Sequence, residues 1–241
     1  MPRARAARPV GAPGSPDDLH RRAAPERVAV TGGVAETGAG LPAGVILAGG
    51  RATRMGGGDK GLLQLGGRTM LDRVVGRLGP QVAALALNAN GDAARFAGFG
   101  LPVVPDSVAG HPGPLAGVLA GLDWAAAQGH DRIVTAAADT PFFPADLVAR
   151  LTRAAEAAAT PIALAATAED GRMARHPTFG LWPVVLRDDL RAALAAGLRK
   201  VVLWTDAHGA ASALFPDGAF FNVNTPADMA EAEARLAAGA A

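Results

Sequence analysis

Cysteine is absent from this 241-residue chain, so the sequence offers no disulfide framework, no thiol nucleophile and no cysteine-ligated zinc or iron–sulfur site. A reducing cytoplasm is therefore the expected compartment. Net charge is nearly absent too, because 23 basic and 22 acidic residues leave a formal charge of +1. Such a chain has no global basic field to attract nucleic acid or an anionic membrane surface. Only a local site can bind anions.

The chain also lacks the roughly 18 consecutive apolar residues that a transmembrane helix requires. Its charge-free stretch at 107–122 is interrupted by prolines, glycines and a histidine. Hydrophobic residues nevertheless make up 50% of the chain and charged residues 19%. A sequence of this length and composition can bury a sizeable core in one domain, or at most two. We therefore expect a soluble, folded protein.

Residues 1–42 have no sustained apolar periodicity, and their alanines, glycines and arginines are interspersed with Pro2, Pro9, Pro13, Pro16, Pro25 and Pro42. This composition predicts a disordered N-terminal extension followed by a domain at 43–241. The extension lacks the apolar core of a signal peptide, and its acidic residues argue against a transit peptide. A gene start assigned too far upstream explains the segment equally well.

From Gly44 onward, short apolar runs alternate with helical patterns, which predicts a three-layer α/β domain with a doubly wound, mostly parallel sheet. The predicted strands are 45–48, 82–88, 101–104, 132–137, 162–167, 177–182 and a late one near 219–223. The predicted helices are 69–78, 115–128, 145–159, 184–196, 200–208 and 227–236. The last helix has the clearest start, because Thr225 suits the N-cap and Pro226 the first helical position.

Polar or glycine residues follow the strands of this predicted sheet. Gly49 comes after the first strand, Asn88 ends the second, and Asp106 and Asp139 follow the third and fourth. In open α/β sheets, ligands bind beyond the carboxyl ends of the strands. If the strands are parallel, these groups converge on one edge of the sheet.

The segment at 46–61, ILAGGRATRMGGGDKG, opens from a predicted buried strand and contains six glycines and three basic residues. Glycines let backbone N–H groups approach a ligand and form an anion-binding nest, while basic side chains add positive charge. The segment therefore predicts a phosphate-binding loop. Its Lys60 is one of only two lysines, the other being Lys200, among 23 basic residues. This indicates that a compact, flexible ammonium is preferred there to a planar guanidinium.

Several familiar motifs are excluded. A P-loop needs glycine before its lysine and serine or threonine after it, whereas Asp59 and Gly61 flank Lys60. The glycines at 56–61 fit a dinucleotide-binding pattern, but they begin too far beyond the strand to close a strand–helix turn. No serine lies in a G-x-S-x-G motif, and the histidines show no metal-ligand spacing.

Residues 47–56, LAGGRATRMG, followed by Asp59-Lys60, resemble the signature loop of nucleotidyltransferases, which pass a nucleoside monophosphate from a nucleoside triphosphate to a phosphorylated acceptor. Within that superfamily the chain is similar to the molybdenum cofactor guanylyltransferases. The resemblance runs from Gly44 to about Leu236, and it includes the segments at 87–90, 106–117, 139–141 and 222–226. It implies a Rossmann-like nucleotidyltransferase fold.

The resemblance also implies the reaction, in which GMP passes from GTP to molybdenum-bound molybdopterin and pyrophosphate leaves. It assigns Asp139 as the ligand of Mg²⁺, and the chemistry agrees, because a carboxylate ending a buried strand can hold a magnesium ion that also bridges triphosphate oxygens. Lys60 and Arg54 would grip the triphosphate and stabilise the departing pyrophosphate. A helix-entry role for Asp139 is the alternative.

The guanine and ribose would lie against Leu47, Ala48 and Gly49, with Asn88 and Asp106 as side-chain contacts. A carboxylate at Asp106 can accept hydrogen bonds from guanine or from ribose hydroxyls, and the sequence does not distinguish these.

On the molybdopterin side the resemblance places Asn222, Asn224, Gly113 and Gly117. Ordinary turn formation explains the two glycines about as well, and capping of the last helix is an alternative for the two asparagines. His176, in a His-Pro-Thr segment, has either a pterin-side or a structural role.

Three rival functions stay open. A cytidylyltransferase of the same fold is nearest, and Gly49, where those relatives tend to have alanine, favours the larger guanine. Sugar-phosphate nucleotidyltransfer is more distant. A protein that binds GTP without turnover and hands cofactor to an apo-enzyme belongs to another class. A recipient molybdoenzyme or cofactor-insertion protein is the expected partner, with no nucleic acid and no membrane.

Overall fold

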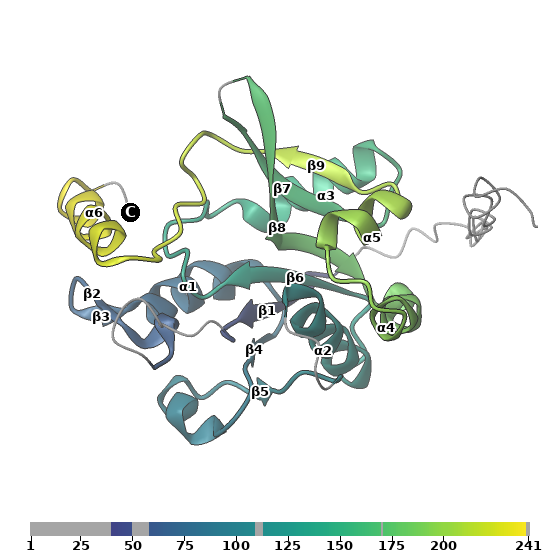
Figure 1. Cartoon of the computed structure of the whole chain (residues 1–241), viewed down its shortest axis with the longest axis horizontal. Coiled ribbons are helices and arrows are strands. Elements are labelled where there is room, and N and C mark those ends of the chain that lie inside the picture. Colours follow the sequence, from purple (N-terminus) through teal and green to yellow (C-terminus); the bar gives the residue numbers. More distant parts are fainter. Residues whose placement is uncertain (1–39, 50–57, 109–112, 170, 240–241) are drawn as a thin grey trace, which may run out of the picture. The chain divides into compact units, whose positions relative to one another are not determined.

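A seven-stranded sheet forms the centre of the computed structural model, which describes residues 40–49, 58–108, 113–169 and 171–239 (Figure 1). The strand order is β5-β4-β1-β6-β8-β7-β9. The strands are β1 (Ala43–Leu47), β4 (Leu85–Asn88), β5 (Val103–Val104), β6 (Arg132–Ala137), β7 (Ala163–Glu169), β8 (Arg172–Pro183) and β9 (Ala211–Leu214). The short, apolar sequences of β1 and β4 suit strands that are covered by helices on both faces.

Parallel pairing dominates the sheet. β1 pairs in parallel with β4 and β6, β4 with β5, and β7 with β9, whereas β8 is antiparallel to both β6 and β7. The chain leaves β1 in one direction, through β4 to β5, and then crosses to β6 on the other side of β1. This is a topological switch point, where open α/β sheets bind their ligands. The predicted mostly parallel, doubly wound sheet is confirmed.

Helices cover both faces of the sheet, which gives the three predicted layers (Figure 1). On one face, α1 (Met70–Leu78) and α3 (Leu147–Ala157) bury their leucines in a common core cluster. On the other face lie α2 (Pro114–Ala127), α4 (Arg187–Ala195) and α5 (Val201–Ala207). Each fully buried leucine contributes about 1.5–3 kcal/mol relative to an exposed one, so both faces contribute to stability.

A smaller cluster joins the C-terminal helix α6 (Pro226–Ala237) to a hairpin of β2 (Gln64–Leu65) and β3 (Arg68–Thr69). Helix α6 begins as predicted, with Thr225 as N-cap and Pro226 in the first turn. Thr225 and Asp228 form a capping box, in which each side chain accepts a hydrogen bond from the other residue's backbone N–H. Short 3₁₀ segments complete the chain: η2 (Lys60–Leu62), η3 (Gly79–Gln81), η4 (Ala93–Phe99) and η5 (Val184–Leu186).

The predicted strand near 219–223 is wrong. The last strand is β9, Ala211–Leu214, which pairs with β7, while residues 219–223 form a turn and an irregular segment. Phe220 in this segment is buried by aromatic packing, because its ring lies 4.7 Å from Phe179 and 5.1 Å from Phe215 between ring centroids. The apolar residues at 219–223 therefore contribute to core packing and do not form a strand of the sheet.

Residues from Gly40 onward form one compact unit. Residues 1–39 lie outside the described part of the chain, so the disorder predicted for 1–42 stays a prediction. Among the described residues, no helix has the length and apolarity needed to span a bilayer.

Candidate active site

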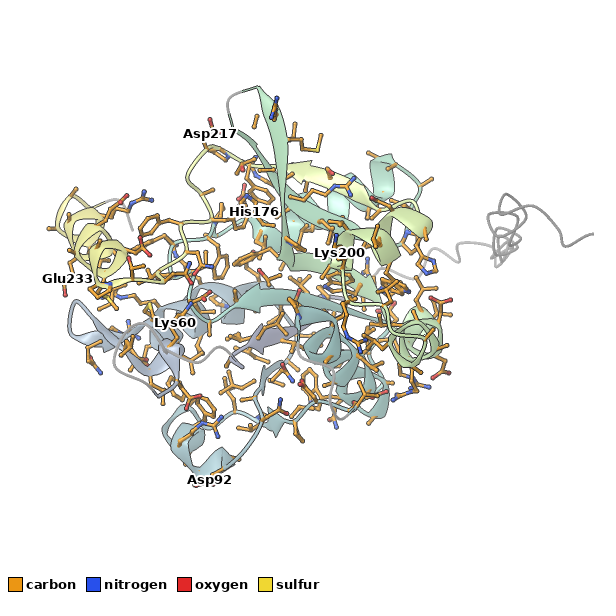
Figure 2. The ribbon with its side chains drawn as sticks, viewed as in Figure 1. Lys60, Asp92, His176, Lys200, Asp217 and Glu233 are labelled. Atoms are coloured by element: carbon orange, nitrogen blue, oxygen red, sulfur yellow. The ribbon has the colours of Figure 1, made fainter. Side chains whose placement is uncertain are left out.

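Lys60 lies at the edge of the sheet toward which β1 and β6 point (Figure 2), and there it contacts Asp139. Asp139 follows the end of β6, and Lys60 is the first residue of η2. The ammonium Nζ of Lys60 donates to Oδ2 of Asp139 at 2.7 Å, and the two side chains are only 13% and 19% exposed. This is a charge-assisted hydrogen bond in a partly desolvated setting, where it is stronger than on an open surface.

Gly61 lets η2 approach the end of β6 closely. Gly61 is buried, and a methyl group in place of its hydrogen would lie 3.1 Å from the Cβ of Ala138. A side chain at this position would require Ala138 or η2 to shift by a few tenths of an ångström.

Asn224 is the second acceptor for Lys60, whose Nζ donates to its Oδ1 at 2.5 Å. Two contacts hold the irregular segment that carries Asn224. The Val223 N–H donates to the backbone oxygen of Asp139 at 2.9 Å, and the Asn224 N–H donates to Oδ2 of Asp228 at 2.8 Å. The Asn224 hydrogen bond is the main reason that the pKa of Asp228 lies below its ordinary value. The cap of α6 thus positions the Asn224 amide beside Lys60.

Asn222, Val223 and Asn224 differ in exposure. Asn222 is exposed, Val223 is buried and Asn224 is half-buried. The two asparagines therefore alternate with a buried residue, although the segment is not part of the sheet.

On the neighbouring strands, Asn88 and Asp106 form a second polar group. The Nδ2 of Asn88 donates to Oδ1 of Asp106 at 3.0 Å and to the backbone oxygen of Val104 at 3.1 Å. Asn90, which sequence reasoning included only as part of a motif, donates from Nδ2 to Oδ2 of Asp106 at 2.8 Å and accepts from its backbone N–H at 2.8 Å. The carboxylate of Asp106 is therefore fixed in orientation by two amides.

Gly117 lies on α2 directly against this group. A Cβ at Gly117 would stand 2.3 Å from Oδ1 of Asn88 and 2.8 Å from Cδ2 of Leu47, which is closer than atoms can approach. Gly113, the N-cap of α2, has φ of 143°, a conformation that favours glycine. Both glycines are therefore required by the local backbone or packing, independently of any ligand.

Leu47, Ala48 and Gly49 lead out of β1 beside these groups. The Ala48 N–H donates to the backbone oxygen of Asn88 at 2.9 Å, and the Leu47 oxygen accepts from Ala138 at 3.1 Å. Ala48 is buried and Gly49 exposed, so the chain emerges at the sheet edge between the Asn88 and Asp139 groups. The parallel register, with Leu47 opposite both Asn88 and Ala137, brings them together.

Arg95 is a residue that sequence reasoning missed. Its Nε donates to Oδ2 of Asp59 at 2.5 Å, and its Nη2 donates to the backbone oxygen of Asn90 at 2.6 Å. It thus links the residue before Lys60 to the segment that fixes Asp106. No local sequence pattern indicates this contact, because Arg95 and Asp59 lie 36 positions apart.

Arg54, predicted to grip the triphosphate, lies in 50–57, outside the described residues. In the described part of the chain there is no group of three or more histidine, cysteine, aspartate or glutamate side chains that could hold a metal. Asp139 alone can still serve Mg²⁺, which commonly uses one or two protein carboxylates and otherwise waters and phosphate oxygens. Among the described residues, its Oδ1 accepts a hydrogen bond from Thr140 alone, at 3.4 Å, so that oxygen has capacity for a ligand.

His176 has a well-defined setting beside this edge. Its Nε2 lies 2.9 Å from the Thr167 hydroxyl, and its ring stacks on Phe220 with centroids 4.5 Å apart. These contacts hold the imidazole in one orientation. They account for a structural role and do not by themselves assign a ligand.

The chain matches the model of the MobA-like NTP transferase domain over residues 44–210. It is 56% identical over 195 residues to the molybdenum cofactor guanylyltransferase of Cereibacter sphaeroides, covering 80% of this chain and 96% of that protein. With the molybdenum cofactor guanylyltransferase of Bradyrhizobium sp. (strain ORS 278) it shares 54% identity over 201 residues, covering 81% and 92%.

Solved structures agree on the fold. The molybdopterin-guanine dinucleotide biosynthesis protein A of Archaeoglobus fulgidus superposes with a TM-score of 0.64 at 22% identity, covering 81% of this chain and 99% of that one. The 4-diphosphocytidyl-2C-methyl-D-erythritol synthase of Anaerococcus prevotii gives a TM-score of 0.64 at 14% identity, covering 82% and 96%. At such low identity these likenesses establish the nucleotidyltransferase fold alone. The sequence relatives and the family match go further, and the chain belongs to the molybdenum cofactor guanylyltransferase family of MobA-like nucleotidyltransferases.

Proposed function

We propose that this protein transfers GMP from GTP to the terminal phosphate of molybdenum-bound molybdopterin, with release of pyrophosphate. The observation that carries the proposal is the pairing of Lys60 with Asp139 at the edge of the sheet where β1 and β6 end. Transfer from a triphosphate needs cations that neutralise its charge, and Lys60 together with a magnesium ion held by Asp139 would supply them. The names of the sequence relatives support guanine as the base and molybdopterin as the acceptor.

Lys60 is prepared for an anionic substrate. An ammonium group has three N–H donors. Within the described residues, Lys60 donates one to Asp139 and one to Asn224, which leaves the third for a phosphate oxygen. Because the side chain is fixed before substrate arrives, little reorganisation is needed as charge develops on the leaving pyrophosphate. Arg54 would add a second positive charge to the same triphosphate.

Asp139 would hold the magnesium ion, mainly through its Oδ1. When bound, Mg²⁺ would act as a Lewis acid and neutralise part of the triphosphate charge. The carboxylate also orients Lys60 through their hydrogen bond, so loss of Asp139 would disturb both positive groups of the site.

Asp106 would receive the nucleoside. Each of its oxygens accepts one amide hydrogen bond and has a further lone pair for a guanine N–H or a ribose hydroxyl. Both N–H groups of Asn88 are used within the protein, so we propose that Asn88 acts mainly by orienting Asp106. Leu47, Ala48 and Gly49 would line the nucleoside.

Asn222 and Asn224 would face molybdopterin. Gly113 and Gly117, also predicted on that side, belong to α2, where Gly117 lies against Asn88 and Leu47. Asn224 also contacts Lys60, so under this proposal it would lie between the triphosphate and the acceptor. The proposed compartment is the cytoplasm, and a molybdoenzyme or an insertion protein would receive the product. The domain would begin at residue 43, after an extension at 1–42.

Turnover tests this function. The purified chain is incubated with GTP, Mg²⁺ and molybdenum-loaded molybdopterin, and the guanine dinucleotide and pyrophosphate are quantified. We expect both products in equal amounts from GTP and little from CTP or ATP. Product from CTP instead of GTP would replace this proposal by cytidylyl transfer. Binding of GTP with no pyrophosphate release would assign the protein a carrier role.

A further inference from the structure

A positively charged cavity lies outside the candidate active site. It has a volume of about 250 Å³ and is lined by Arg68, Asp72, Arg73, Arg77, Pro141 and Phe142, with Gly76 between the last two arginines. The arginines come from β3 and α1, which lie side by side (Figure 1). Pro141 and Phe142 follow Asp139 directly along the chain. We refer to it as the α1 cavity.

None of the three arginines of the α1 cavity forms an ion pair within the described part of the chain. Arg73 donates only to backbone oxygens, to that of Leu65 at 2.7 and 3.0 Å and to that of Gly66 at 3.1 Å. Arg77 donates from Nε to the backbone oxygen of Pro141 at 3.1 Å, and its two Nη groups have no partner among the described residues. Three guanidinium charges therefore share one small space without a neutralising carboxylate bonded to them.

Asp72 is the only acidic residue lining the α1 cavity, and it is already engaged. Its Oδ2 accepts from the Thr69 N–H at 2.9 Å and from the Thr69 hydroxyl at 2.7 Å, as part of the cap of α1. Three arginines and one aspartate leave a formal charge of 3 − 1 = +2 around the cavity. Burial and the charge of Arg73 lower the pKa of Arg77, which is the expected effect of an unpaired cation in this position.

From this arrangement we infer that the α1 cavity is a binding site for a small phosphate-bearing anion. A phosphate dianion matches the charge of +2, and the planar forks of arginine bind phosphate oxygens in pairs. The cavity volume of about 250 Å³ suits one or two phosphate groups. The inference does not depend on the proposed transfer reaction.

An anion bound in the α1 cavity would affect the position of Asp139. The Nε of Arg77 holds the backbone oxygen of Pro141, two residues beyond Asp139, and Phe142 forms part of the wall. An anion that binds the Arg77 guanidinium would therefore affect the loop that carries both Pro141 and Asp139.

Isothermal titration calorimetry of the full chain tests the site, with inorganic phosphate and pyrophosphate as probes at constant ionic strength. The Lys60→Ala variant is used as background, because it weakens binding at the candidate active site. We expect pyrophosphate to bind this variant with one site and more tightly than phosphate does. If phosphate alone binds, the site accepts a single phosphate group. If Lys60→Ala abolishes binding of both probes, all binding belongs to the candidate active site and the inference fails.

Variants then locate the site. In the Lys60→Ala background, Arg77→Gln is expected to weaken binding tenfold or more, since a charge-assisted hydrogen bond to phosphate is lost, and Arg77→Lys is expected to lose less. Arg68→Gln removes an exposed charge that forms no hydrogen bond in the described structure, so it keeps the fold and should weaken binding severalfold. The control is Arg153→Gln on the exposed face of α3.

Unchanged affinity in both Arg68→Gln and Arg77→Gln would overturn the assignment. So would binding of a tetraglutamate peptide where neither phosphate probe binds, because the cavity would then serve an acidic protein segment. Turnover of GTP is measured separately, so failure of the transfer reaction and failure of this site give different results.

Discussion

The ammonium nitrogen of Lys60 lies 2.7 Å from Oδ2 of Asp139, although the two residues are 79 positions apart in the chain. One follows the glycine-rich loop and the other follows β6. Their contact joins the segment at the start of η2 to the end of β6, so both segments contribute to one site. Each side chain limits the motion of the other, which is the form of preorganisation that electrostatic catalysis requires.

Replacement of Lys60 by alanine should reduce GMP transfer by about 10²- to 10³-fold, the usual effect of removing one preorganised charge at a transition state. Lys60→Arg should also impair turnover, since the planar fork cannot reach Asp139 and Asn224 as one compact ammonium does. Initial rates with GTP measure both. Lys200→Ala is the matched control, because Lys200 is exposed at the start of α5. Wild-type rates for Lys60→Arg would contradict the preference for lysine.

Asp139→Asn should lower both the rate and the response to magnesium, because a neutral amide is a poorer ligand for Mg²⁺ and no longer pairs with Lys60. Rates titrated against Mg²⁺ concentration give the measurement, and circular dichroism checks the fold. Asp217→Asn, on an exposed turn, should match the wild type. A magnesium response identical to the wild type in Asp139→Asn would assign the metal to other residues.

Gly117→Ala should destabilise the protein by about 1–3 kcal/mol, the usual range for an overpacked core. The new methyl group would lie 2.3 Å from Oδ1 of Asn88, so either α2 or Asn88 must move. Movement of Asn88 releases Asp106, and the KM for GTP should rise. Urea denaturation and steady-state kinetics measure the two effects.

The control for Gly117→Ala is Gly76→Ala on α1, where no atom lies within 4 Å of the added methyl. This change should be neutral or stabilising by up to about 1 kcal/mol, because alanine favours a helix more than glycine does. Equal destabilisation by the two changes would show that the contact with Asn88 is not the cause.

Stability should fall in acid through the capping aspartates. The pKa of Asp228 lies below its ordinary value of 3.8, mainly because its carboxylate accepts a hydrogen bond from the Asn224 N–H. A lowered pKa means that the ionised form is favoured by folding, so the contribution is present above pH 3.8 and is lost as the pH falls through the lowered folded-state pKa. The pKa of Asp72 is lowered in the same way, first by its hydrogen bond with the Thr69 hydroxyl.

Urea unfolding of the wild type and of Asp228→Asn, measured at several pH values below and above 3.8, tests this. The variant should be less stable than the wild type at neutral pH and should approach it in acid. In addition, the neutral-pH rate of GMP transfer should fall in Asp228→Asn, since Asn224 loses the contact that holds it near Lys60. A constant difference in stability at every pH would show that the charge of Asp228 is not responsible.

The sequence was sufficient to predict the layered α/β fold and the edge where the site lies. Hydrophobic runs, turn residues and the cap at Thr225 are local signals, and parallel strands bring their ends together by geometry. The prediction misplaced the last strand, because an apolar run with phenylalanines at 220 and 221 is equally typical of a strand and of a segment packed in an aromatic cluster. The strand that pairs with the edge of β7 is Ala211–Leu214, and this pairing is a tertiary contact.

The glycine-rich loop, its lysine and the polar ends of the strands could be identified from residue type and order alone, because that chemistry needs those residues near one another along the chain. Only the tertiary structure decided what each one contacts. Arg95 joins Asp59 across 36 positions, and Gly117 is required by the side chain of Asn88. The α1 cavity likewise combines residues from α1, β3 and the loop after β6. Such contacts arise from packing between distant segments, for which a single sequence has no local pattern.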